Sequence, residues 1–279
     1  MRLVKKTVRL IVQLLLLFYS YIKPSKGIPV LLYHETRVND NNKTIPNIPL
    51  SVFREQMDYL YRRGYKTISS QEVVEIVRNK KKIPSKTVVI TFDDGFKSNL
   101  EAFDIMKEYH FNGICFVATS FIGQTYNYMP FWLDNTDVKY ATSSSKDQPF
   151  VFMSKDDLKK VSTQGHIEFF PHTHHHIDMI SFSDDEICRE IEESEYVLNI
   201  EGNHKVFSYP RGLYDERIKK ILIGLGYDLS FAVKVGVITK DTDLLEIPRV
   251  NVPSEKYLFR LILTDKYRIY DYLSAKINK

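Results

Sequence analysis

The sequence predicts an α/β protein in which a distorted (β/α)7-type barrel forms a single domain over residues 27–279. Two observations predict this fold. Short apolar runs rich in strand-forming residues alternate along the chain with amphipathic helical patterns, as they do in parallel sheets and barrels. About seven such runs occur without an internal repeat in a chain of 279 residues, which is long enough for one large α/β domain.

The apolar runs and the amphipathic patterns define the expected elements in chain order. Strands are expected at residues 29–33, 87–92, 113–118, 167–170, 206–209, 229–233 and 246–250. Helices are expected at residues 51–63, 70–78, 99–109, 155–162, 184–199 and 216–224. Ser51 and Ser154 are the predicted N-caps of two of these helices. The polar residues 135–148 indicate a surface loop or insertion, and residues 256–279 a pair of closing helices.

Residues 1–26 predict a membrane-contacting segment separate from the barrel. A basic cluster precedes an apolar stretch at residues 10–22, and no small-residue cleavage site follows this stretch. Thirteen helical residues span roughly 20 Å, less than the ~30 Å hydrocarbon core of a bilayer. We expect an uncleaved short anchor, with the body outside the cytoplasm in the cell envelope. The alternative is an amphipathic helix that lies on the inner face of the membrane.

Charge and cysteine content exclude some classes of protein. Residues 1–26 hold six of the 39 basic residues and none of the 35 acidic ones, which leaves 33 basic residues and a net charge of −2 for the body. A nearly neutral body argues against nucleic acid as a partner. The two cysteines, Cys115 and Cys188, are too few for a disulfide framework.

Two adjacent carboxylates, Asp93 and Asp94, follow directly on the apolar run of residues 88–92. Side chains alternate along a strand, so the two would point to opposite sides unless the strand ended there. Gly95 permits a turn that brings both carboxylates to one site. Adjacent like charges are costly, and a metal ion is a common way to offset them. The alternative is an ordinary aspartate pair at a helix N-terminus.

Four of the eight histidines fall within residues 172–176. Pro171 suits the first position of a helical turn, on which His172 and His176 would share one face. His175 is an alternative partner for His172 in such a turn. Imidazole favours zinc, nickel, cobalt or iron, and two histidines with one aspartate leave positions open for water and substrate. A solvated histidine-rich loop is the alternative interpretation.

These two motifs, Thr-Phe-Asp-Asp-Gly and His-Thr-x-x-His about 80 residues later, resemble those of the polysaccharide deacetylases of carbohydrate esterase family 4. The order of strands and helices from about residue 27 to 253 is similar as well. The resemblance implies that Asp93 is the general base and that Asp94, His172 and His176 hold a divalent metal ion. Zinc is the first expectation for this metal, with nickel or cobalt as possibilities.

The family usually supplies its general acid as a histidine from a late strand, but no histidine follows His204 here. The first strand instead ends in His34 and Glu35, which resembles that late motif moved to the front. In this respect the chain is similar to circularly permuted poly-N-acetylglucosamine deacetylases, and the resemblance implies that His34 is the acid. A partly buried structural histidine at a strand end is the alternative.

Residues 206–214 resemble the groove-forming motif of the family, with two departures. Ser208 and Arg211 stand where many members have an arginine and a tyrosine, and Arg249 is our candidate replacement for that arginine in catalysis. A backbone N–H near Arg211 is a candidate oxyanion-hole donor. The segment would equally suit a plain strand-to-turn junction. The expected substrate-binding residues are Tyr209, Pro210, Arg211, Tyr214 and, in another segment, Trp132.

Together these features predict a metal-dependent hydrolase that removes N-acetyl groups from an amino-sugar polymer, such as poly-N-acetylglucosamine or another envelope glycan. The expected partners are this glycan and a membrane. Two alternatives fit the same residues. One is a catalytically silent glycan-binding or assembly protein, and the other is a deacylase of a different acylated sugar.

Overall fold

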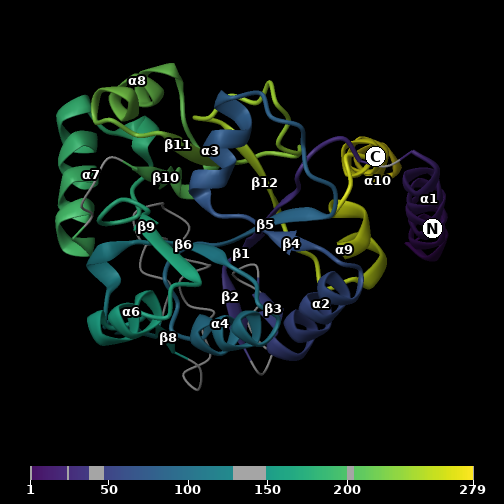
Figure 1. The fold of residues 1–279 in the computed structure, drawn as a ribbon, viewed down its shortest axis with the longest axis horizontal. Coiled ribbons are helices and arrows are strands. Elements are labelled where there is room, and N and C mark those ends of the chain that lie inside the picture. Colours follow the sequence, from purple (N-terminus) through teal and green to yellow (C-terminus); the bar gives the residue numbers. More distant parts are fainter. Residues whose placement is uncertain (1, 24, 38–46, 128–148, 200–203, 279) are drawn as a thin grey trace.

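Seven parallel strands form a nearly closed barrel in the computed structural model, which describes residues 2–278 except 24, 38–46, 128–148 and 200–203 (Figure 1). Their order around the barrel is β10 (Val206–Ser208), β11 (Leu229–Val233), β12 (Ile247–Asn251), β1 (Val30–Tyr33), β5 (Thr87–Phe92), β6 (Gly113–Val117) and β9 (Ile167–Pro171). The edge strands β9 and β10 lie beside each other, and β4 (Lys66–Thr67) adds to the start of β5. The predicted (β/α)7-type barrel is confirmed.

Helices pack around this barrel between the strands (Figure 1). They are α2 (Leu50–Arg62), α3 (Ser70–Arg78), α4 (Asn99–Glu108), α6 (Lys155–Ser162), α7 (Asp184–Leu198) and α8 (Glu216–Gly224). Short elements complete the connections: β2 (Glu35–Arg37), β3 (Asn47–Pro49), β7 (Thr125–Tyr126), β8 (Phe150–Val151), and the 3₁₀ turns η1 (Thr119–Phe121), η3 (Met179–Ser181) and η4 (Pro210–Gly212). The bounds of α3, α6, α8, β5 and β11 coincide with those predicted, because apolar periodicity and caps agree there.

One of the two predicted N-caps is correct. The Ser154 hydroxyl accepts a hydrogen bond from the backbone N–H of Asp157, whose carboxylate accepts one from the Ser154 N–H at 2.9 Å. Ser51 is not a cap, because α2 already begins at Leu50. Pro49 ends β3 with an extended backbone and takes the N-cap position instead.

Alternation along the strands divides the core into two layers. On β5, Val88, Ile90 and Phe92 face the outer helices, whereas Val89 joins an apolar cluster of inward-facing residues that also holds Phe116 and Phe231. Successive side chains of a strand point to opposite faces, so Thr91 and then Asp93 continue the inward row of Val89. The barrel interior is therefore apolar towards the amino ends of the strands and polar at their carboxyl ends.

The tail forms the expected helix pair, α9 (Lys256–Ile262) and α10 (Tyr267–Asn278). Helix α1 (Arg2–Ile22) packs beside these two at the edge of the molecule (Figure 1). None of the helices in the described ranges has both the length and the apolar character needed for a membrane crossing. The predicted polar insertion at residues 135–148 lies outside the described residues.

Candidate active site

Polar side chains gather at the carboxyl ends of neighbouring strands, where active sites of such barrels form. His34 follows β1 and Asp93 follows β5, and the Asp93 N–H donates to the Tyr33 carbonyl at 3.0 Å, which continues the ladder by one residue. Arg249 lies on β12 and Ser208 at the end of β10. The parallel register thus brings residues 34, 93, 208 and 249 together, although they are far apart in the sequence.

A left-handed turn after β5 brings the second aspartate to the same site. Asp94 has a φ of 75° and Gly95 a φ of 83°. In a continued strand Asp94 would face away from Asp93, but here both carboxylates are buried, at 3% exposure each. Aspartate tolerates this conformation better than most residues, yet it costs about 1–2 kcal/mol. The backbone therefore stores strain where the two carboxylates meet.

The histidine-rich segment is a loop and not the predicted helical turn. Strand β9 runs through Pro171, and Thr173 and His176 then adopt left-handed φ values of 59° and 56°. These two reversals, rather than helical periodicity, bring the imidazoles of His172 and His176 to a ring separation of 4.8 Å. His172 and His176 therefore lie together as predicted, but in a loop and not in a helical turn, because β9 keeps the preceding residues extended.

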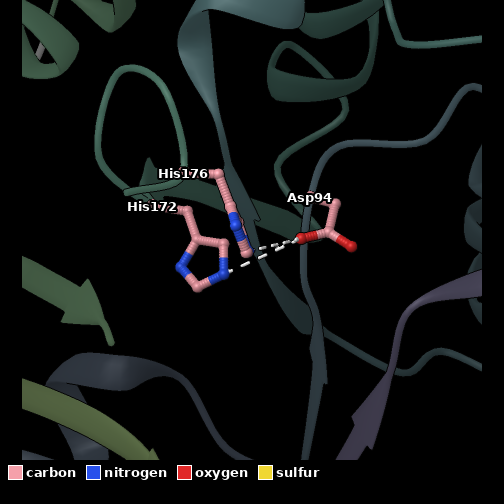
Figure 2. Close-up of side chains that lie close together, drawn as sticks. All are labelled: Asp94, His172 and His176. Carbon is pink, nitrogen blue, oxygen red and sulfur yellow. Dashed lines mark ion pairs between the residues drawn. The ribbon is translucent and has the colours of Figure 1, made fainter. Parts of the chain in front are cut away.

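Asp94, His172 and His176 form a buried set of metal-ligating atoms that lie within 4.8 Å of one another. Figure 2 shows both rings beside the Asp94 carboxylate, whose Oδ1 lies 3.4 Å from Nε2 of His176 and 3.8 Å from Nε2 of His172. Within the described residues this oxygen receives no hydrogen bond, although it is buried. A buried carboxylate oxygen without a donor is costly, and a cation would satisfy it.

The protonation of the three side chains suits a divalent metal ion. Nδ1 of His172 lies 2.8 Å from the Ser208 carbonyl oxygen, which can only accept, so Nδ1 carries the proton and Nε2 keeps its lone pair. Burial lowers the pKa of both His172 and His176, so both imidazoles are neutral and have a lone pair that could bind a metal. Burial and the neighbouring charges of Asp93 and Glu35 raise the pKa of Asp94 well above its usual value, which a bound cation would reverse.

Asp93 is held by a buried guanidinium. Arg249 donates to its Oδ1 from Nη1 at 2.6 Å and to its Oδ2 from Nη2 at 2.8 Å, and Nη2 also donates to Ser208 Oγ at 2.6 Å. Burial alone would raise the pKa of Asp93, but the charges of Arg249 and His172 and the hydrogen bonds from Arg249 lower it to about 2. Arg249 also lies over the Phe116 and Phe231 rings of the apolar layer.

His34 lies within electrostatic reach of this pair. Burial lowers the pKa of His34 to about 4, while the negative charge of Asp93 acts in the opposite direction. Its Nδ1 has no hydrogen-bond partner within the described part of the chain. The Asn99 amide donates to the His34 carbonyl at 2.8 Å and its oxygen accepts from the Thr36 N–H at 3.2 Å. Asn99 thus fixes the His34 segment, and no sequence signal distinguished it from other helix residues.

Two of the four clustered histidines turn away from the site. Nδ1 of His174 lies 2.7 Å from the Thr119 hydroxyl, and Nδ1 of His175 lies 2.6 Å from Oε1 of Glu190 on α7. His175, the alternative partner of His172, is therefore occupied elsewhere. Their contacts join the loop to η1 and α7 and hold it in place.

The expected substrate-binding residues lie in different environments. Tyr209 is fully buried and its hydroxyl donates to the Leu245 carbonyl at 2.9 Å, which places its ring in the core. Tyr214 stacks on Tyr209 with ring centroids 4.5 Å apart, and Pro210 is buried. Arg211 is exposed and has a left-handed φ of 57°. Trp132 lies outside the described residues.

The sequence of the chain matches the profile described as "Polysaccharide deacetylase" over residues 80–230, more than half of its length. The chain belongs to the polysaccharide deacetylase family. This confirms the predicted family and the predicted enzyme class, a deacetylase and hence a hydrolase. The profile covers Asp93, Asp94, His172, His176 and Ser208, whereas His34 and Arg249 lie outside it.

Alignments with known relatives cover most of this polysaccharide deacetylase and not only residues 80–230. It is similar to the poly-beta-1,6-N-acetyl-D-glucosamine N-deacetylase of Staphylococcus epidermidis, with 25% identity over 250 residues, 81% of this chain and 79% of the relative. Its fold is similar to that of the Streptococcus pyogenes deacetylase PplD, with a TM-score of 0.68, 22% identity and coverage of 86% and 99% of the two chains. IcaB from Ammonifex degensii gives a TM-score of 0.68 at 20% identity, with coverage of 85% and 97%.

Proposed function

We propose that this polysaccharide deacetylase hydrolyses the N-acetyl groups of a β-1,6-linked N-acetylglucosamine polymer in a metal-dependent reaction. The observation that supports this most directly is the side-by-side arrangement of the Asp94–His172–His176 set and the Asp93–Arg249 pair, with His34 at the end of the adjacent strand. The name of the Staphylococcus epidermidis relative supports this choice of substrate. The cell envelope, expected from the N-terminal segment, is the proposed location.

The proposed metal is zinc, held by Asp94, His172 and His176. Two imidazoles and one carboxylate are a common zinc ligand set that leaves positions open. When bound, such a cation supplies Lewis acidity: it polarises a carbonyl and lowers the pKa of a water towards about 7. Ser208 supports this site through its carbonyl, which fixes the proton of His172 on Nδ1.

Asp93 is the proposed general base. With a pKa of about 2 it is ionised at neutral pH, and it takes a proton from the water that attacks the acetamide carbon. Arg249 does not act on the substrate itself in this scheme. It is a positioning residue that fixes both carboxylate oxygens, a refinement of the catalytic role expected from the sequence.

His34 is the proposed general acid. The amine of the sugar departs only if its nitrogen is protonated, because an amide anion is too poor a leaving group. With a pKa of about 4, His34 is neutral at neutral pH before the reaction. It must therefore gain a proton during the cycle, and Asp93, whose charge acts on His34, is the proposed source.

The decisive experiment measures acetate release by the full-length chain from β-1,6-linked N-acetylglucosamine oligomers, with added zinc, nickel or cobalt and after chelation. We expect release that stops on chelation and returns with metal. Oligomers with β-1,4 links and peptidoglycan fragments test the substrate class. If metal binds but no acetate is released from any of these glycans, the proposed deacetylation is wrong. Release from the β-1,4-linked or peptidoglycan substrates alone would contradict only the proposed β-1,6-linked substrate.

A further inference from the structure

Helix α1 turns its apolar face towards solvent. Six apolar side chains recur along it at intervals of three and four residues and so lie on one face. We call them the α1 stripe: Val4, Val8, Ile11, Leu15, Phe18 and Ile22. Each is between 39% and 66% exposed. In Figure 1, α1 lies at the edge of the molecule, beyond α9 and α10. An apolar face of this length is unusual for a protein surface in water.

The opposite face of α1 is the one that faces the body, and it is largely polar. Gln13 is 2% exposed and donates to the Tyr270 hydroxyl of α10 at 3.0 Å. A groove of about 1340 Å³ separates the N-terminal half of α1 from α9 and α10, and its lining includes Lys5, Arg9 and Asp271. A helix that only covers a core in water buries its apolar face and exposes its polar one. Here the orientation is reversed.

The N-terminal segment that carries the α1 stripe has a positive charge. Residues 1–26 carry six basic side chains and no acidic one, and the first acidic residue of the chain is Glu35. A second groove, of about 440 Å³, adjoins the C-terminal half of α1 at Leu17 and Tyr21 and is lined by Lys86, Arg63 and Arg260. An apolar face on a helix whose polar face and surroundings are basic is typical of helices that lie on anionic lipid surfaces.

We propose that α1 lies in the plane of an anionic membrane surface, which for a protein of the cell envelope is the outer face of the cytoplasmic membrane, with the α1 stripe at the boundary between headgroups and acyl chains. A spanning helix would be apolar all round over its whole length, whereas Arg9, Gln13 and Ser20 give α1 a polar face opposite the stripe. A second copy of the chain fits less well, because apposed stripes would bring two clusters of six positive charges together. This docking holds the barrel at the membrane whatever reaction the site performs.

Vesicle flotation tests this inference. The full-length chain should float with vesicles of phosphatidylcholine and phosphatidylglycerol, and much less with phosphatidylcholine alone. The variant Ile11→Ser/Leu15→Ser/Phe18→Ser should bind the anionic vesicles at least about tenfold more weakly. It should keep the acetate release of the parent from soluble oligomers, since α1 is remote from the site. If this triple variant floats like the parent, the stripe does not contact lipid.

A matched control removes exposed apolar side chains elsewhere. Ile180, Tyr196 and Ile223 are 45%, 86% and 62% exposed on η3, α7 and α8. Their triple replacement by serine should leave flotation unchanged. Equal loss in both triple variants would overturn the inference, because general surface hydrophobicity would then explain binding. A parent that is dimeric in solution and becomes monomeric on loss of the stripe would favour a second copy as the occupant.

The depth of the helix distinguishes an in-plane from a spanning arrangement. Val4→Trp, Ile11→Trp and Phe18→Trp place a fluorophore near each end and near the middle of the stripe. Quenching by lipids brominated at known depths, corrected for the native Trp132, should give one shallow depth for all three. A deeper position for Ile11→Trp than for the two end positions would show a spanning helix and overturn the proposal.

Discussion

Arg249 donates hydrogen bonds to both carboxylate oxygens of Asp93 inside the barrel, with Nη–Oδ distances of 2.6 and 2.8 Å. The pair is buried, with Arg249 1% and Asp93 3% exposed, and it rests on the aromatic rings of the apolar layer. Bidentate geometry fixes the orientation of the carboxylate as well as its charge. The pair therefore determines where a proton can be accepted in the site and over which pH range.

Replacement of the guanidinium should affect both rate and pH dependence. Arg249→Met leaves Asp93 buried without its counter-charge, so the pKa of Asp93 rises and its orientation is lost. We expect kcat to fall about 100-fold at neutral pH, and the acid limb of kcat/KM to move to higher pH. Ser208→Ala removes only one acceptor of Arg249 and should cost less than about tenfold. An acid limb that stays in place would contradict the assigned role of Arg249.

Variants of the two adjacent aspartates should distinguish loss of the catalytic step from loss of metal binding. Asp93→Asn should reduce turnover about 10²–10⁴-fold while metal stays bound, because the amide cannot act as a base. Asp94→Asn and His172→Ala should lose the metal as well as the activity, because each removes a proposed ligand. Metal content after dialysis, measured beside acetate release, distinguishes the variants. Asp93→Asn with nearly normal turnover would show that the base is another group.

Asp93 should also make stability depend on pH in the acid range. Its folded pKa of about 2 lies below the unfolded value of 3.8, so the unfolded state binds more protons between these values. The ion pair thus contributes roughly 2 kcal/mol of stability above pH ~4, and this contribution is lost as pH falls towards 2. Urea unfolding from pH 5 to 2 should show a shallower decline for Asp93→Asn than for the parent. Parallel declines would exclude this linkage.

A serine–histidine–aspartate arrangement at the other end of the barrel should be structural. Ser70 Oγ lies 2.8 Å from Nε2 of His204, whose Nδ1 lies 3.3 Å from Oδ2 of Asp228, and the same Oγ donates to Glu168 at 2.8 Å. Ser70 has 0% exposure, so no substrate reaches it. Ser70→Ala should lower the free energy of unfolding by about 1–3 kcal/mol without changing acetate release.

The exposed Ser254 offers the matched control for this variant. Ser254→Ala should change stability by less than about 0.5 kcal/mol. A serine-reactive fluorophosphonate should label neither the parent nor Ser70→Ala. Labelling of the parent that disappears in Ser70→Ala would instead identify Ser70 as a nucleophile.

The barrel was predictable from local patterns. Strands such as β5 are short apolar runs that end in turn residues, and helices such as α3 and α6 combine apolar periodicity with serine caps. The start of α2 was not predictable from a local pattern. Pro49, the last residue of the short strand β3, sets the position where that helix begins. Strand pairing depends on residues distant in the chain, which a local pattern does not contain.

For the site, the sequence by itself determined the residue types: two aspartates after an apolar strand, clustered histidines, and a histidine ending the first strand. Only the tertiary structure decided how they meet. Left-handed backbone at Asp94, Thr173 and His176 redirects side chains that regular periodicity would separate. The parallel register brings Arg249 to Asp93 across 156 residues of sequence. Such contacts arise because closure of the barrel brings inward side chains of different strands together. The sequence of a single segment does not contain this information.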